Sequence, residues 1–588
     1  MAIPPGIELI FKDILPNAFK LPFITFLFLK LLQQFPFGVN LPTWGWVAAL
    51  VTVHPANWII STLYNTQRVK KEAAARGGML VPRVKGGSFE LIGKIRNGYM
   101  AEGFFEWSRQ YGQTYIFRIF GADRIMTMEP EHIKAILATQ FDDFHKGEME
   151  EDQLNSLLGS GVFNSDGEFH RNMTRPFFSK VRISDYDVFE RHAEETLSVL
   201  ADRLAQGYPV DFQDAVARFT LDSATQFLFG KAVDSTSAGL PYPPSSSSSY
   251  PSSSLTSSDI YLTHPSTKFV TAFAQGQQAV TLRSIRGKYW RLFEFWKDEA
   301  AGYRKDVEEF VNPILDEAIK SLKRKEKGDM ESGSGSGSIK DVGEEETFLE
   351  HLVKKVIMDE LLNILLAARD TTASLLTFSV YVLTQRPDIV ARLKSEISEK
   401  VGFARRPTYE DTREMKYLRA FLNETLRLYP SVSPKHATTL PNKNGKPWYV
   451  PAETRCVYSV FLMHRREDLW GPDALEFDPD RFLDDRLHKY LTPNPFIFLP
   501  FNAGPRICLG QQFAYNEASY FLIKLLQKFD NFSHALDVQP SQPPPEWKPE
   551  PGTTKGRDKV TLFSHLTMSV KDGLWIRMKS AHETFKDG

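Results

Sequence analysis

The sequence has very little cysteine: only Cys456 and Cys508 occur among its 588 residues. Two thiols cannot form the disulfide framework of a secreted protein, so we expect the main part of the chain to face a reducing compartment. Net charge is also nearly absent, because 71 basic and 72 acidic residues leave a formal charge of −1. Since no basic run is interleaved with aromatic side chains, nothing in the sequence predicts binding to nucleic acid.

The sequence also lacks an internal repeat, and no small-residue cleavage site follows a short apolar core. A cleaved secretory signal is therefore not expected. The chain is rich in apolar side chains: 42% of its residues are hydrophobic and 13% are aromatic. This composition is typical of a globular protein and excludes a disordered or fibrous one.

The N-terminal region carries the longest uncharged stretch. "LPTWGWVAALVTVHPANWIISTLY" (Leu41 to Tyr64) has no formal charge and is long enough to cross a bilayer core of about 30 Å. The basic residues that follow it predict, by the positive-inside rule, that the main body lies on the cytoplasmic side. The earlier segment "LPFITFLFLKLLQQF" contains Lys30 and is expected to lie in the membrane interface. We predict a membrane anchor region over residues 1–75, with a buried helix of a soluble body as the alternative.

Residues 76–588 are predicted to form one mainly helical domain with small β-sheets, an α+β fold. "TYIFRIF" and "RIMTM" indicate a hairpin near residue 120, and "KVTLFSHLTMSV" with "LWIRM" indicates a last hairpin near the C-terminus. Three irregular stretches are predicted to be flexible insertions, because their Ser, Gly and Pro content cannot bury a core. They are residues 241–259, 327–346 and 538–552.

Cys508 lies in "PFNAGPRICLGQQFA", where a loop is expected to become a helix. Unpaired N–H groups at a helix start stabilise a thiolate, which is the form of cysteine that binds metals. Arg506 adds a cation suited to an anionic cofactor, while Gly504 and Gly510 let the backbone approach a flat ligand. From these residues alone, Cys508 could equally be a small buried apolar side chain or be bonded to Cys456.

The same stretch resembles the cysteine-ligand loop of the cytochrome P450 family, F-x-x-G-x-R-x-C-x-G. Phe501, Gly504, Arg506, Cys508 and Gly510 occupy every fixed position. The resemblance implies a cytochrome P450 catalytic domain over residues 76–588. It also implies haem b as the cofactor, with the Cys508 thiolate as the axial ligand of the iron.

A second motif lies in the long apolar helix predicted over Asp359 to Asp388. An Arg369–Asp370 pair inside such a helix is costly unless it is paired or functional, and a plain structural ion pair is the alternative. "AARDTT" is similar to the family's oxygen-activation motif. The resemblance implies that Asp370 and Thr371 form an acid–alcohol pair that relays protons, although Ala368 stands where the family usually has glycine.

Glu424 and Arg427 are spaced to share one face of a helix, which alone would indicate only a solvated pair. "PDRF" after them matches a further family element, and the resemblance implies that its Arg481 completes a buried triad. We interpret these three residues as structural support for the haem side of the molecule.

Two sequence elements that the resemblance leads us to expect around the haem propionates are incomplete. Arg171 matches the family's propionate-binding arginine, but the usual tryptophan before it is missing. The stretch Ser433 to Ala437 lacks another expected arginine, for which Lys435 or His436 is the candidate substitute. These departures concern propionate binding more than the thiolate.

The function implied by the resemblance is that of a membrane-bound monooxygenase, most like fungal hydroxylases of alkanes and fatty acids. Its partners would be O2, a lipophilic substrate and NADPH–cytochrome P450 reductase, in the endoplasmic reticulum membrane with the catalytic domain facing the cytoplasm. A haem-binding protein with impaired turnover is one alternative, and a haem-thiolate peroxygenase or isomerase is another. Phe269 and Phe273 are candidates for the access channel, or simply for the core.

Overall fold

The structure is a computed structural model. It describes residues 3–35, 41–85, 90–91, 93–94, 98–165, 174–184, 186–244, 261–331, 348–431, 440, 445–452 and 454–581. Arg171 and the stretch from Ser433 to Ala437 lie outside the described residues, as do residues 245–259 and 332–346 of two predicted insertions. Residues 327–331, predicted as the start of the second insertion, are helical instead and continue a long helix that begins at Glu299.

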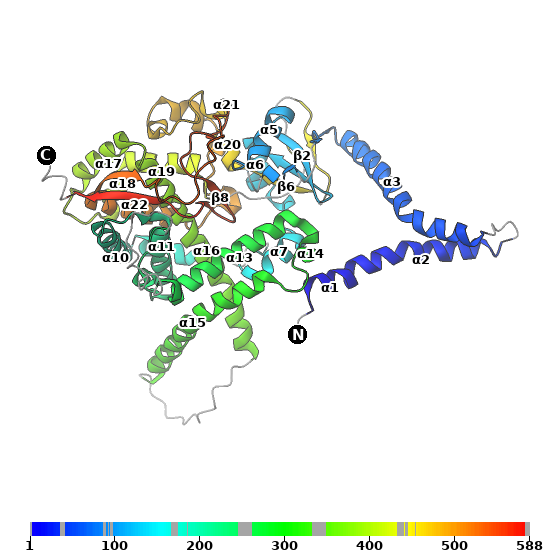
Figure 1. Cartoon of the computed structure of the whole chain (residues 1–588), viewed down its shortest axis with the longest axis horizontal. Coiled ribbons are helices and arrows are strands. Elements are labelled where there is room, and N and C mark those ends of the chain that lie inside the picture. Colours follow the sequence, from blue (N-terminus) through cyan, green and yellow to red (C-terminus); the bar gives the residue numbers. More distant parts are fainter. Residues whose placement is uncertain are drawn as a thin grey trace.

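The N-terminal helices stand apart from a compact body (Figure 1). Helix α1 (Pro5–Leu9) continues through a wider turn, Ile10–Ile14, into α2 (Leu15–Leu32), and α3 (Thr43–Ala75) follows. By length and composition, two helical stretches among the described residues could cross a membrane, Pro5–Leu32 and Thr43–Ala75, and the body buries neither apolar window. The second includes all but the first two residues of the predicted segment Leu41 to Tyr64, so the buried-helix alternative does not hold.

The first part of the body contains small sheets. Strands β2 (Thr114–Ile119) and β3 (Ala122–Thr127) form the predicted hairpin, and β6 (Arg455–Tyr458) joins β3 in parallel. Strand β1 (Met79–Leu80) pairs in parallel with β5 (Trp448–Tyr449), directly after α3. These pairings join the start of the body to residues more than 300 positions later in the chain.

Helices make up most of the remaining body, as predicted. They are α5 (Glu102–Tyr111), α6 (Pro130–Lys134), α7 (Glu148–Leu158), α9 (Lys180–Ile183), α10 (Tyr186–Ala205), α11 (Phe212–Phe229), α13 (Pro265–Arg286), α14 (Trp290–Phe293), α15 (Glu299–Glu331), α16 (Phe348–Leu383), α17 (Pro387–Lys400), α18 (Tyr409–Glu414), α19 (Lys416–Leu428), α20 (Val460–Met463), α21 (Glu467–Trp470) and α22 (Gln511–Lys528). Sequence signals set several of their ends. The Asp211 carboxylate, for example, accepts from two N–H groups at the start of α11, and Gly230 with φ 73° ends that helix.

Helix α16 is the centre of the packing, as its nearly continuous apolar surface predicts. It lies against α11, α19 and α22. Leu376 and Phe378 of α16 are fully buried, and the rings of Phe219 on α11 and Phe521 on α22 lie 4.6 Å apart. Phe269 and Phe273 of α13 are also buried and stack with centroids 5.6 Å apart, so they belong to the core.

The C-terminal strands correct one prediction. β8 (Leu562–Ser564) and β9 (Met568–Val570) form a hairpin within the first predicted run, while β10 (Trp575–Ser580) lies between β4 (Val210–Asp211) and β7 (Phe529–His534). The turn between the two runs contains Asp572 and Gly573 at positive φ, which redirects the chain to this other sheet. Residues 538–552 form an irregular loop whose Trp547 packs edge-on against Tyr99, 5.9 Å away.

Candidate active site

Cys508 lies in the turn before α22, as predicted. A short helical turn, Gly504–Arg506, precedes it, and its N–H donates to the Phe501 carbonyl at 2.9 Å. Its side chain is exposed, whereas Cys456 is buried in β6, and the two cysteines are not joined in a disulfide. The structure therefore contains neither the predicted alternative disulfide nor a buried Cys508.

The two glycines beside Cys508 differ in what they require. Gly504 has φ 59°, and a Cβ there would lie 2.2 Å from the Leu137 carbonyl oxygen, so the fold itself requires glycine. Gly510 has an ordinary φ of −85°, and a Cβ would meet no atom closer than 3.5 Å. Since protein packing does not explain Gly510, the close approach of a ligand remains a reason for its small size.

Arg506 and Phe501 fix the two ends of this loop. Nη2 of Arg506 donates to the Phe144 carbonyl at 2.7 Å, and its guanidinium lies 4.8 Å from the Phe141 ring. The ring of Phe501 packs against Tyr515 of α22 at 5.1 Å. Arg506 thus also has a structural role that the sequence did not predict.

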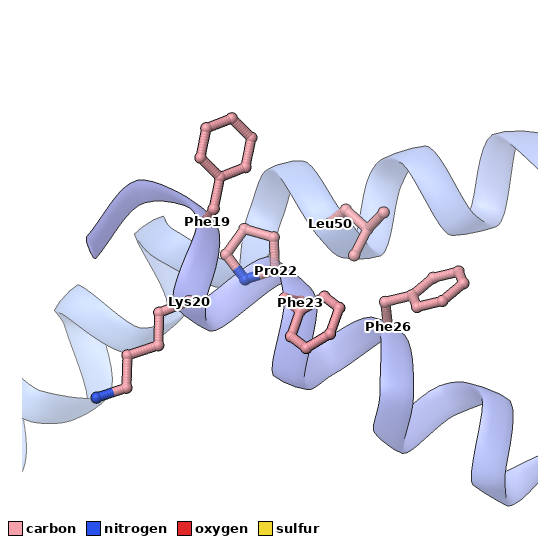
Figure 2. A pocket seen from close by; sticks show the side chains of 6 residues that line it. All are labelled: Phe19, Lys20, Pro22, Phe23, Phe26 and Leu50. Carbon is pink, nitrogen blue, oxygen red and sulfur yellow. The ribbon is translucent and has the colours of Figure 1, made fainter. Parts of the chain in front are cut away.

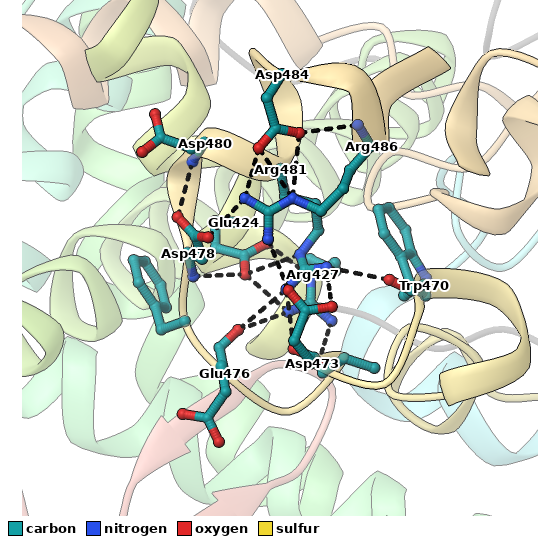
Figure 3. A network of polar contacts seen from close by, with 12 residues as sticks. Glu424, Arg427, Trp470, Asp473, Glu476, Asp478, Asp480, Arg481, Asp484 and Arg486 are labelled. Carbon is teal, nitrogen blue, oxygen red and sulfur yellow. Dashed lines mark hydrogen bonds and ion pairs between the residues drawn. The ribbon is translucent and has the colours of Figure 1, made fainter. Parts of the chain in front are cut away.

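Glu424, Arg427 and Arg481 form the predicted buried triad (Figure 3). Arg427 donates two bonds to the Glu424 carboxylate, at 2.6 and 2.7 Å, and Nε of Arg481 lies 3.4 Å from the same carboxylate. The remaining guanidinium N–H groups bind main-chain carbonyls, including those of His464 and Ala474 from Arg427 and Trp470 from Arg481, and Arg481 also donates to the Asp473 carboxylate at 3.1 and 3.2 Å. Buried charges are tolerated when paired in this way, so the triad fastens α19 to the loop over residues 470–481.

His464 links this triad to the cysteine loop, a role that no pattern in the sequence indicated. Its Nδ1 lies 3.1 Å from the Arg427 carbonyl, and its Nε2 lies 3.0 Å from the Leu499 N–H. Nε2 must accept that bond, so the proton is on Nδ1. Burial, together with the Arg427 charge, lowers the pKa of His464 to about 3, which keeps it neutral. His464 therefore connects Arg427 of α19 to the main chain at Leu499, which lies two residues before Phe501.

Asp370 and Thr371 lie on α16, but they do not hydrogen-bond to each other in the part of the chain that the structure describes. The Asp370 carboxylate accepts from Arg369 Nη1 at 2.6 Å and from Gln277 Nε2 of α13 at 2.7 Å. The Thr371 hydroxyl donates to the Ala367 carbonyl at 2.5 Å. Gln277 is a second residue that the sequence did not reveal, because it lies 93 positions away on another helix.

A buried carboxyl joins α22 to the same part of α16. Glu517 is completely buried, close to the hydroxyls of Ser223 on α11 and Thr372 on α16, and all three residues are nearly or wholly inaccessible. Burial raises the pKa of Glu517 to about 8, although the two hydroxyls oppose the shift. Glu517 therefore lies where α22, the helix that follows Cys508, packs against α16, the helix that carries Asp370 and Thr371.

The described residues fit a haem held through one thiolate. Cys508 is exposed, Gly510 leaves room beside it, and the neighbouring Ile507 presents an exposed apolar side chain. Within the described ranges no group of three or more His, Cys, Asp and Glu side chains could hold a metal. The propionate-binding positions, Arg171, Lys435 and His436, lie outside those ranges, so their predicted roles stay predictions.

Comparisons with known proteins agree with the motifs. A family model described as Cytochrome P450 matches residues 87–555. Cytochrome P450 52A5 of Candida maltosa is 34% identical over 522 residues, which cover 83% of this chain and 88% of that protein. Cytochrome P450 monooxygenase himC of Aspergillus japonicus is 35% identical over 80% of this chain and 76% of its own length. Cytochrome P450 52A9 of Candida maltosa is 32% identical over 91% of this chain and 98% of its own length.

Proposed function

Because this chain belongs to the cytochrome P450 family of haem-thiolate monooxygenases, we propose that it hydroxylates an alkane, a fatty acid or a similar lipophilic compound. NADPH–cytochrome P450 reductase would supply the electrons, since no flavin or nucleotide motif occurs in this sequence. Residues 1–75 would anchor the protein in the endoplasmic reticulum membrane, and residues 76–588 would form the catalytic domain on the cytoplasmic face. The observation that carries the proposal is the exposed Cys508 in a complete cysteine-ligand loop before α22, the helix that packs against α16 with its Asp370 and Thr371.

Cys508 would hold the haem iron through its thiolate, beside Arg506, Phe501, Gly504 and Gly510. When bound, the haem would cleave the O–O bond of O2, and the thiolate would favour that cleavage by donating electron density. The protein's own part is orientation, exclusion of water and the supply of protons. Glu424, Arg427 and Arg481 would serve the site indirectly, by holding the loop through His464 and Leu499.

Asp370 and Thr371 would deliver protons, and Gln277 would control the Asp370 carboxylate. In the structure Arg369 donates to one oxygen of that carboxylate and Gln277 to the other, and each oxygen keeps a further lone pair that can accept a proton from water. Both donors favour the charged form of the carboxylate, and the neutral Gln277 amide binds it less strongly than the Arg369 guanidinium does. The Thr371 hydroxyl donates to Ala367, so its oxygen is left to accept a hydrogen bond from water.

Reconstitution tests the proposal. The haem-loaded protein, the reductase and NADPH are incubated with long-chain alkanes or fatty acids, and NADPH use, O2 use and hydroxylated product are measured together. We expect product in proportion to NADPH. NADPH and O2 use without any product would favour the haem-binding protein with impaired turnover. Product formed from hydrogen peroxide, and not from reductase and O2, would favour the peroxygenase.

A further inference from the structure

We propose that α2 and α3 cross the bilayer as an antiparallel two-helix hairpin, which places the N-terminal residues on the same side as the catalytic domain. This inference rests on the membrane anchor proposed above and goes beyond it. A single crossing by Leu41 to Tyr64, with the earlier segment in the interface, would leave the N-terminal residues and the catalytic domain on opposite sides. The hairpin requires instead that both helices cross.

The surfaces of both helices suit a lipid environment. Neither apolar window is buried by the rest of the protein, and large apolar side chains are more than half exposed along each helix. In water, such a continuous exposed apolar surface would be strongly unfavourable, so a bilayer is the partner that fits it. These side chains are Phe19, Phe23, Ile24, Leu27, Phe28 and Leu31 on α2, and Trp44, Val47, Val51, Trp58, Ile59, Ile60 and Leu63 on α3.

The contacts between the helices follow one antiparallel register. The rings of Phe26 and Trp46 lie 5.4 Å apart, and His54 Nε2 lies 2.8 Å from the Ala18 carbonyl. A step of eight residues back along α2 is thus a step of eight residues forward along α3. Between these contacts, Leu50 faces Pro22, Phe23 and Phe26 across an apolar hollow (Figure 2). Because the two helices pack in one register, we expect them to cross the membrane together as a packed pair.

The hydrogen bond from His54 gives the Ala18 carbonyl a partner that it would otherwise lack in lipid. Pro22 lies inside α2 and has no N–H, so the carbonyl of Ala18, four residues before it, loses its helical partner. In the hydrocarbon core no water can replace that partner, and an unpaired carbonyl is costly. His54 Nε2–H of α3 supplies the donor. A polar residue that interrupted the predicted span thereby becomes part of the contact between the two helices.

Both ends of the hairpin return to the body of the protein (Figure 1). At the first end, the Gly6 N–H donates to the Phe295 carbonyl at 2.9 Å, and a Cβ on Gly6 would collide with the Phe295 ring. At the second end, the Met79 N–H donates to the Pro447 carbonyl at 2.7 Å, and the Tyr449 hydroxyl bonds to Glu72. A chain that leaves the body and returns to it crosses the membrane an even number of times.

Exposed aromatic residues beside the first end agree with this placement. Phe293 and Trp296 flank Phe295 and are 54% and 74% exposed. Aromatic side chains are favoured at the level of the lipid headgroups. The body therefore meets the membrane surface near the point where α1 docks.

The charges have the distribution that this topology needs. From Leu31 to Gln67 the chain contains no Asp, Glu, Lys or Arg, so the far end of the hairpin can be moved across the membrane easily. Lys30, near that end, lies over the Trp46 ring at 5.4 Å. Lys20 is the least favourable residue, because it lies deepest, and its long side chain must extend toward the headgroups. Its side chain points away from Leu50 and the helix contact (Figure 2).

Single cysteines test the topology in sealed microsomes with a membrane-impermeant maleimide, using the full haem-loaded chain. Ile3→Cys reports the N-terminal end, Gln34→Cys the far end of α2, and Leu536→Cys the catalytic body; all three positions are exposed. The parent protein gives the background from its own two thiols. We expect Ile3→Cys and Leu536→Cys to react in sealed vesicles, and Gln34→Cys to react only after detergent opens them.

Two results would overturn the hairpin. Reaction of Gln34→Cys in sealed vesicles would show that the connection between the helices lies on the same side as the catalytic domain and that α3 does not cross, and protection of Ile3→Cys would show an odd number of crossings. Oxidative cross-linking tests the register: Phe26→Cys with Trp46→Cys should link, and the control Phe26→Cys with the outward-facing Val47→Cys should not. Labelling requires no turnover, so it can fail while the proposed hydroxylation holds, and hydroxylation can fail while the labelling pattern holds.

Discussion

Replacing Glu517 with glutamine should remove a large part of the pH dependence of stability. The Glu517 carboxyl is fully buried, and burial raises its pKa from 4.5 to about 8. Each pKa unit is equivalent to about 1.4 kcal/mol, so the whole difference corresponds to about 5 kcal/mol.

The sign follows from proton binding. Below pH 4.5 the carboxyl is protonated in both the folded and the unfolded chain, and its contribution to folding stability is fully present. Between pH 4.5 and 8 the folded protein holds a proton that the unfolded chain has lost, so the free energy of unfolding falls as the pH rises. Between pH 6 and 8 the loss from this group is about 2 kcal/mol. Glutamine cannot ionise, and its uncharged amide lies beside the hydroxyls of Ser223 and Thr372, which can pair with it.

Urea unfolding of the haem-loaded protein at several pH values measures this effect. We expect the urea midpoint of the native protein to fall more steeply from pH 6 to pH 8 than that of Glu517→Gln. Glu546→Gln, at an exposed glutamate, is the matched control and should follow the native protein. An identical pH dependence in the native protein and in Glu517→Gln would refute the reasoning.

Three further substitutions test other parts of the site. Thr371→Ala should keep its haem content but divert most O2 use away from product, whereas Thr371→Ser should retain coupling; full coupling in the alanine variant would contradict a role in proton delivery. Gln277→Leu removes one donor from the Asp370 carboxylate and should shift the pH profile of coupled turnover at unchanged haem content, so an unaltered profile would exclude it as a positioning residue. Glu424→Gln leaves the Arg427 charge buried without its partner and should destabilise the fold by about 3–5 kcal/mol in thermal or urea unfolding. A loss below about 1 kcal/mol, as for an exposed pair, would show that the triad is not needed for stability.

The sequence was enough for features that depend on nearby residues. The apolar spacing after Cys508 predicted a helix, and α22 begins at Gln511. The i,i+3 spacing of Glu424 and Arg427 placed them on one helix face, where the structure shows them in contact. Charge-free length identified α3, because bilayer thickness sets a minimum that can be read directly from the chain.

Features that depend on residues distant in sequence could not be predicted in this way. Gln277 meets Asp370, and His464 meets Leu499, only because separate elements pack together. Glu517 looks like an ordinary polar position of α22 until its burial between α11 and α16 is known. The final strand was misplaced for the same reason, since Trp575–Ser580 pairs with strands far away in the sequence and not with its neighbour.

The central claim is that Cys508 supplies the thiolate ligand of a haem. The most direct measurement is the absorption spectrum of the reduced, haem-loaded protein with carbon monoxide. We predict a strongly red-shifted Soret band for the native protein and for Cys456→Ala, the matched cysteine control, and its loss in Cys508→Ala. An unshifted band in folded, haem-loaded native protein, or a red-shifted band that persists in Cys508→Ala, would contradict the claim.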